Sequence, residues 1–287
     1  MSAVDIIQRA RAHIYGQGIG EAPTLVIGNA NAAESISAPL ITFNVATNEG
    51  AKVNAGDVLS IIDAADADSA FMLYVTSVST DAITAYMGYL GSPSPTTAND
   101  LDGAVFELNP LKSEWLMWQK LESVFSTMLW PTIYKYNNYT VTPDLSDYQV
   151  ELNAAVEVIV DAKQTIGGTF ISIPYALQKN LSTSVSSTTV LGELYAIDGS
   201  SVYITTKERY AASDTLPSGL EECAAVGVAA MTLGAARSST DLEASSKDSQ
   251  FRGQRNPADS LWRDFITLRS SLAEDLAVEE EWFEYYR

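Results

Sequence analysis

The stretch YVTSVSTDAITAYMGYLGSP, residues 74–93, predicts a β-hairpin that ends at a corner. Apolar and polar residues alternate on both sides of Thr80-Asp81, which is the length of a tight two-residue hairpin turn. Gly88, Gly91 and Pro93 then interrupt the second strand. Because the stretch carries no catalytic motif, it indicates a structural element.

Short β-type runs continue on both sides of this hairpin. Together with the hairpin, the runs in the first block are 24–28, 40–45, 57–62, 71–78, 82–87 and 104–108. Turn residues separate them, a pattern typical of a small antiparallel barrel or sandwich. A second block, between about 139 and 210, contains the runs 156–161, 169–173, 192–197 and 201–206. Asp198-Gly199 lies between the last two runs and predicts a second hairpin.

Helical patterns lie before, between and after these blocks. Residues 3–15 place Ile6, Ile7, Ala10 and Ile14 on one side of an amphipathic helix. Asn109-Pro110 predicts the start of a second helix, since Asn suits the N-cap and Pro the first helical position. A third, rich in small residues, is expected to begin at Ser218 and to pack closely against its neighbours. The last helix should begin at Asn256-Pro257, with an apolar stripe at Leu261, Phe265, Leu268, Leu272 and Leu276.

These patterns predict an α+β fold, with a helical bundle assembled from N-terminal, central and C-terminal helices and two inserted antiparallel β modules. The expected bundle comprises residues 1–20, 109–137 and 217–287. The expected β modules, each a small barrel or sandwich, are residues 21–108 and 138–216.

Composition limits the possible functions. Hydrophobic residues make up 46% of the 287 residues and charged ones 18%, so we expect a folded chain. The formal net charge of −19, from 36 acidic and 17 basic residues, argues against wrapping nucleic acid, which needs clustered Lys and Arg. The N-terminus lacks the apolar stretch of a signal peptide, and no run is long enough to span a membrane. We therefore expect a chain made in the cytoplasm, with no membrane partner.

The candidate catalytic and metal-binding residues can each be explained by an ordinary structural role. One cysteine and one histidine allow neither an internal disulfide nor a two-histidine metal centre. Asp63, Asp66 and Asp68 lack the glycine and the closing glutamate of a calcium loop, so a solvated loop is favoured. His13 has no partner in a recognisable motif, and Cys223 is expected to be a small buried thiol. The sequence predicts no enzyme, no cofactor and no metal; a hydrolase using Asp63 and Asp66 is the remote alternative.

Three groups of residues could contact a partner. The end of the chain mixes glutamates with Trp282, Phe283, Tyr285, Tyr286 and Arg287, which fits either a docking peptide or a solvated helix end. Arg252 and Arg255 lie in a loop that could meet a phosphate or an acidic partner, or could simply be exposed. The aromatic cluster is expected to serve packing or an interface more than base stacking; its members are Trp130, Tyr134, Tyr136 and Tyr139.

The first β block resembles a small β module of tailed-bacteriophage neck and tail proteins. The matching text is Gly56-Asp57 before a strand, then Tyr74-Val75-Thr76-Ser77-Val78, the two-residue turn, the strand 82–87, and Gly88-Tyr89-Leu90-Gly91-Ser92. The module usually has an arginine before the first of these glycines and a threonine after the second. Met87 and Ser92 stand at those positions here.

The order of helices and β blocks resembles the head-to-tail connector adaptors of tailed phages. The resemblance implies a structural virion protein at the neck, in a homo-oligomeric ring of about twelve subunits that joins the portal to a tail or nozzle protein and lets DNA pass. It also implies that the C-terminal segment, Trp282 to Arg287, docks on the portal. Another virion component, such as a tail or fibre protein, is the alternative.

Overall fold

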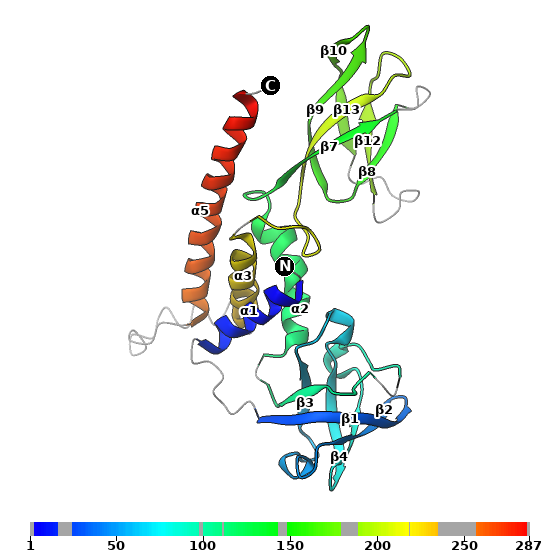
Figure 1. Cartoon of the computed structure of the whole chain (residues 1–287), viewed down its shortest axis with the longest axis vertical. Coiled ribbons are helices and arrows are strands. Elements are labelled where there is room, and N and C mark those ends of the chain that lie inside the picture. Colours follow the sequence, from blue (N-terminus) through cyan, green and yellow to red (C-terminus); the bar gives the residue numbers. More distant parts are fainter. Residues whose placement is uncertain are drawn as a thin grey trace, which may run out of the picture. The chain divides into compact units, whose positions relative to one another are not determined.

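The computed structural model describes residues 3–16, 25–97, 100–110, 112–142, 148–178, 189–217, 219–234 and 257–285. For 25–34, 178, 189, 257 and 275–285 the description covers the backbone alone. The chain divides into two compact units (Figure 1): unit 1 comprises Met1–Val124 with Thr215–Arg287, and unit 2 comprises Phe125–Asp214.

The described residues form thirteen strands in three antiparallel sheets and four α-helices, so the fold is mostly β. The expected α+β class, organised around a helical bundle, is therefore wrong. The helical stripes were easy to see in the sequence, whereas several strands of unit 2 are polar and short. KYNNYTV (135–141) and QVELN (149–153) hold few apolar residues, and neither was predicted.

Unit 1 contains a closed barrel with the strand order β1-β2-β5-β4-β3-β6. The strands are β1 (Leu25–Ser37), β2 (Leu40–Val45), β3 (Val58–Ile62), β4 (Met72–Ser79), β5 (Ala82–Tyr86) and β6 (Val105–Leu108). The barrel closes because the long strand β1 pairs with β2 at one end and with β6 at the other, with register shifts that bend it. The barrel interior is filled by the Phe43 and Phe106 rings, whose centroids are 5.3 Å apart, and by aliphatic side chains around them.

The hairpin predicted around Thr80-Asp81 is confirmed. Strands β4 and β5 are antiparallel, Ser79 pairs with Ala82, and Thr80-Asp81 forms the turn. Thr80 has φ of 55°, a left-handed conformation that two-residue hairpin turns require.

The helices of unit 1 come from three separate parts of the sequence (Figure 1). They are α1 (Ala3–Gly16), α2 (Glu114–Ser123), α3 (Leu220–Gly234) and α5 (Pro257–Tyr285). The predicted face of α1 is confirmed, since Ile6, Ile7, Ala10 and Ile14 are all buried. The small residues of α3 let α1, α2 and α5 approach it. Leu261 and Phe265 are the most buried of the large side chains described for α5.

The start predicted for the second helix is wrong. The helix α2 begins at Glu114 with Ser113 as its N-cap, and Ser113 Oγ accepts a hydrogen bond from the Leu116 N–H at 3.3 Å. Asn109 instead adopts φ of 50°, and its side-chain carbonyl accepts a hydrogen bond from the Val58 N–H at 2.8 Å. The Asn-Pro pair therefore ends strand β6, and the helix starts one turn later. A π-helical segment, Val124–Leu129, continues α2.

Unit 2 contains two sheets, with the orders β10-β9-β13-β7 and β11-β12-β8. Their strands are β7 (Lys135–Val141), β8 (Gln149–Asn153), β9 (Val156–Ile166), β10 (Thr169–Ser172), β11 (Tyr175–Gln178), β12 (Thr189–Leu194) and β13 (Val202–Glu208). One apolar core includes residues from both sheets, among them Leu152, Ile159, Leu194 and Ile204.

The hairpin predicted at Asp198-Gly199 is wrong, because β12 and β13 belong to different sheets. The segment between them carries the chain from one sheet to the other. The buried side chain of Gln164 holds this crossing: its Nε2 donates to the Asp198 and Ser200 carbonyls at 2.8 and 3.0 Å, and its Oε1 accepts from the Ile197 N–H. A local turn motif could not reveal this long-range contact.

Candidate functional site

A buried ionic cluster joins the helices of unit 1 to the barrel; we call Arg11, Tyr15, Glu107 and Glu114 the Arg11 cluster. The Arg11 guanidinium donates a hydrogen bond to Glu107 Oε1, and its other terminal nitrogen lies 3.7 Å from Glu114 Oε1. The Tyr15 hydroxyl lies 3.1 Å from both carboxylate oxygens of Glu107. Two carboxylates, from β6 and α2, therefore share one cation from α1.

Glu114 also holds a loop of the barrel. Its two carboxylate oxygens accept hydrogen bonds from the backbone N–H groups of Asp63 and Ala64, at 3.0 and 3.1 Å. Burial raises the pKa of Glu114, and this effect outweighs the stabilisation of the ionised form by those N–H groups and by Arg11. Burial and the neighbouring Glu107 likewise raise the pKa of Tyr15. The cluster thus fixes three elements at one junction and carries an excess of buried negative charge.

A second buried carboxylate, Glu208, organises one end of the sandwich in unit 2. It accepts hydrogen bonds from the Tyr139 hydroxyl and from Thr206 Oγ1, the latter at 3.1 Å. Lys135 Nζ lies 3.9 Å from Glu208 and 2.7 Å from Asp214 Oδ2. Burial and the bond to Glu208 raise the pKa of Tyr139. These contacts tie β13, β7 and the segment after β13 together, which is a stabilising role.

Two members of the predicted aromatic cluster, Tyr134 and Tyr136, contact a lysine from a strand that is distant in sequence. Lys207 on β13 lies 4.0 Å from the Tyr134 ring centroid and 5.2 Å from that of Tyr136, and it donates a hydrogen bond to the Tyr134 hydroxyl at 2.7 Å. Trp130 meets Tyr134 edge to face at 6.3 Å. Burial lowers the pKa of Lys207, but its bonds to the two tyrosines outweigh this and raise the pKa overall. The sequence missed Lys207 because only strand pairing brings it to the rings.

The other reactive residues have structural partners. His13 Nε2 lies 2.7 Å from Glu222 on α3, which also pairs with Arg9 at 3.1 Å. Cys223 is fully buried in α3, as predicted, and burial raises its pKa to about 12. Asp66 caps a 3-10 turn, accepting from the Ser69 N–H at 2.8 Å, while Asp63 uses its backbone to bind Glu114.

The predicted partner-binding residues are only partly described. Trp282, Phe283 and Tyr285 lie in the last turns of α5, where the description covers the backbone. Tyr286, Arg287, Arg252 and Arg255 lie outside the described residues.

The described parts of the chain lack two classes of feature. Within them, no group of three or more His, Cys, Asp or Glu side chains is placed to hold a metal ion. None of the helices described there has both the length and the apolar character needed to cross a membrane.

The sequence did not predict three buried carboxylates: Glu107, Glu114 and Glu208. Glu107 interrupts an otherwise apolar strand, AVFEL, and a carboxylate there is the one local sign of a buried partner. Glu114 and Glu208 offer no comparable sign, because the partners that explain their burial, Arg11 and Tyr139, lie far away along the chain. Comparison with protein-family models, with curated proteins and with solved structures gives no significant match.

Proposed function

We propose that this chain is a structural virion protein of a tailed phage: a ring-forming adaptor that joins the capsid portal to the tail and lets DNA pass. The ring comprises about twelve copies of the chain, as the resemblance to connector adaptors implies. The C-terminal segment from Trp282 to Arg287 binds the portal, and a tail or nozzle protein binds the other side of the ring.

The observation that supports the proposal most is the charge of the barrel. Residues 25–108 contain one basic side chain, Lys52, which pairs with Glu49 at 2.7 Å. The ten acidic residues of the same segment are Glu34, Glu49, Asp57, Asp63, Asp66, Asp68, Asp81, Asp100, Asp102 and Glu107. The resulting formal charge of −9 repels phosphates, so a ring that presents such barrels to DNA would guide it without adsorbing it.

The ionic clusters give the proposal a second support. The charged groups of the Arg11 cluster, and those around Glu208, bind residues of separate elements and so hold these elements together. Such internal joints suit a part that transmits load through a particle, whereas catalysis needs charged groups presented to a substrate.

Electron microscopy of the virus particle that carries this chain tests the proposal. A small affinity tag on the chain would be located with a gold label, and the neck region would be averaged for its symmetry. We expect the label at the neck and a ring of about twelve copies next to the portal. A label on fibres, a trimer, or a chain absent from the particle would overturn the adaptor proposal.

A further inference from the structure

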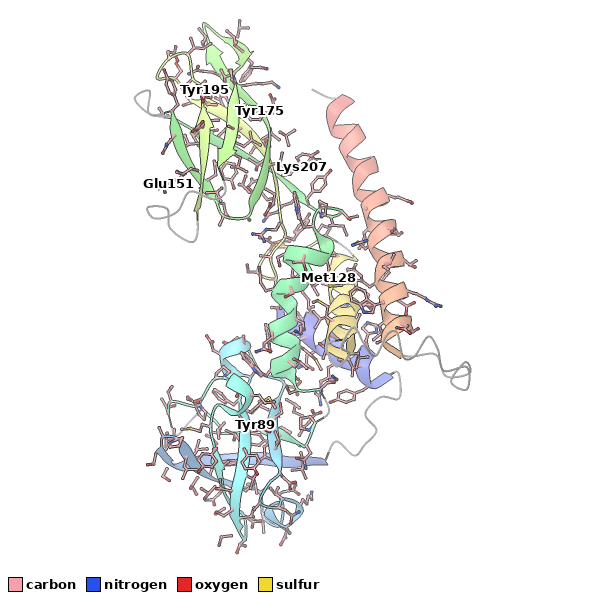
Figure 2. The ribbon with its side chains drawn as sticks, turned by 180° about the vertical axis from the view of Figure 1, so that it is seen from behind. Tyr89, Met128, Glu151, Tyr175, Tyr195 and Lys207 are labelled. Carbon is pink, nitrogen blue, oxygen red and sulfur yellow. The ribbon has the colours of Figure 1, made fainter. Side chains whose placement is uncertain are left out.

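The two outer faces of the sandwich in unit 2 differ in chemistry. Each sheet turns alternate residues toward the shared core, so the remaining residues form its outer face. We call the outer face of β10-β9-β13-β7 the aromatic face, and the outer face of β11-β12-β8 the acidic face. Figure 2 labels Lys207 on the first sheet and Glu151 on the second, at opposite sides of the sandwich.

The aromatic face exposes apolar side chains on neighbouring strands. On β13, Tyr203 is 45% exposed between the buried Val202 and Ile204. The Phe170 ring of β10, 61% exposed, meets the Tyr203 ring edge to face at 5.5 Å. Val158 and Tyr136 are further large exposed apolar residues of this face.

Register places these residues in rows across the sheet. Lys207 on β13 pairs with Val158 on β9 and with Tyr136 on β7, so one row holds a cation between two exposed apolar side chains. Two rows further on the same face, Tyr203 pairs with Lys163, and the row between them holds Thr205, Asn138 and Asp161. The exposed apolar residues therefore form two groups, Phe170 with Tyr203 and Val158 with Tyr136, separated by one polar row; together they are the apolar patch of this face.

The aromatic face carries a small excess of positive charge. Its carboxylates are matched: Asp161 pairs with Lys163 at 2.6 Å, and Glu157 pairs with Arg209 at 2.8 Å. Lys207 is the additional cation, and its neighbours are tyrosine rings and hydroxyls.

The acidic face has the opposite character. Glu151 is exposed on β8 between the buried Val150 and Leu152, and Glu193 on β12 lies between the buried Gly192 and Leu194. The three strands, with the sequences QVELN, YALQ and TVLGEL, contain no Lys or Arg. The Tyr195 ring, 48% exposed, adds apolar surface beside Glu193, to which its hydroxyl donates a hydrogen bond at 3.1 Å.

We infer that the aromatic face of one copy binds the acidic face of a second copy of this chain. Apolar contact around Phe170 and Tyr203 supplies the attraction, and the pairing of Lys207 with the carboxylates of Glu151 and Glu193 sets the orientation. Because the two faces lie on opposite sides of one sandwich, the contact is head to tail and leaves a free face at each end. Such contacts generate rings when the rotation closes and filaments when it does not. The inference names the subunit contact of the proposed ring and rests on that proposed function.

Charge reversal tests the contact with the full chain in solution. We would measure mass against concentration by sedimentation for the wild type, for K207E, for E151K and for the chain that carries both changes. We expect each single reversal to weaken self-association about tenfold, and the double reversal to restore most of it. K52E makes the same charge change in the barrel and should leave association unaltered.

Because Lys207 also contacts tyrosines of its own chain, K207E could weaken association by destabilising the fold, and a second variant distinguishes the two causes. F170S replaces the most exposed aromatic residue of the patch and should weaken association while the thermal unfolding curve stays unchanged. A wild type that remains monomeric at every concentration overturns the inference. Weakening by K207E and F170S without any effect of E151K also overturns it, because it indicates that two aromatic faces meet.

The two proposals can fail separately. If microscopy shows the ring at the neck while the reversals assemble normally, the sandwich contact is wrong and the adaptor function stands. If the chain associates head to tail in solution but is found away from the neck, the adaptor function is wrong and the contact stands.

Discussion

Gly50 packs so closely against Thr80 that a β-carbon at residue 50 would stand 2.0 Å from the Thr80 carbonyl oxygen. The Gly50 N–H also donates a hydrogen bond to Asp81 Oδ1 at 3.2 Å. The backbone of the 3-10 turn at Gly50–Lys52 thus packs directly against the backbone of the hairpin turn. Only glycine leaves room for this contact.

The first prediction is that Gly50→Ala destabilises the barrel by roughly 3 kcal/mol or more, since two backbone segments must separate to admit the methyl group. Urea unfolding followed by tryptophan fluorescence, to which Trp115 and Trp118 beside the barrel core contribute, measures the loss. Gly199→Ala is the matched control, because a β-carbon there meets nothing within 4 Å. A Gly50→Ala chain as stable as the control would show that the hairpin tip can move aside at little cost.

The second prediction concerns the Arg11 cluster. Arg11→Ala leaves Glu107 and Glu114 buried without their cation, so we expect the free energy of unfolding to fall by about 3–5 kcal/mol. Arg9→Ala, on the same helix, removes an ion pair with Glu222 whose side chains are 40% and 38% exposed. That control should cost about 0–1 kcal/mol. Equal losses for the two variants would contradict the stabilising role of the buried cluster.

Glu114 gives the third prediction, a dependence of stability on pH. The pKa of Glu114 is raised in the folded chain above its ordinary value of 4.5, so the folded state binds the proton more tightly than the unfolded state. Its contribution to stability is therefore fully present below pH 4.5 and is lost as the pH rises through the folded pKa.

Glu114→Gln removes this titration and keeps an oxygen that can accept a backbone hydrogen bond. We expect the stability of the wild type relative to Glu114→Gln to decrease as the pH rises from acid to neutral. Urea unfolding of both chains at a series of pH values measures the difference. A difference that increases with pH would mean that Arg11 and the two N–H groups, not burial, dominate the pKa.

The fourth prediction concerns packing between α3 and α5. A β-carbon on Gly227 would stand 2.9 Å from Phe265 Cε2 and 3.2 Å from Val124 Cγ1. We expect Gly227→Ala to destabilise by about 1–3 kcal/mol, reduced by the roughly 1 kcal/mol that alanine gains in a helix. Gly234→Ala on the same helix, whose nearest contact is 3.4 Å from Trp262 Nε1, should be neutral or slightly stabilising. If Phe265→Leu does not reduce the cost of Gly227→Ala, the contact is not its cause.

Local patterns predicted elements better than they predicted the fold class. The barrel strands and the α1 face were visible because alternation and helical spacing act over a few residues, as in Ile6 and Ile14. The distribution of strands between sheets depended on distant partners such as Gln164 with the 196–200 segment. For the same reason the sequence did not predict the Arg11 cluster, in which Arg11 binds Glu107, 96 positions away, and did not place Lys207 in the aromatic cluster.

The last prediction tests the docking role of the C-terminal segment. Leu261 and Phe265, the most buried of the large side chains described for α5, lie near the start of this 29-residue helix, so deletion of 277–287 should preserve their packing. We expect the free energy of unfolding to change by less than about 0.5 kcal/mol, while the proposed attachment to the portal is lost. Co-sedimentation with assembled portal rings measures attachment. Replacing both Trp282 and Phe283 by alanine should reproduce the loss, since aromatic anchors dominate binding energy; normal attachment of both chains would remove the segment from the portal contact.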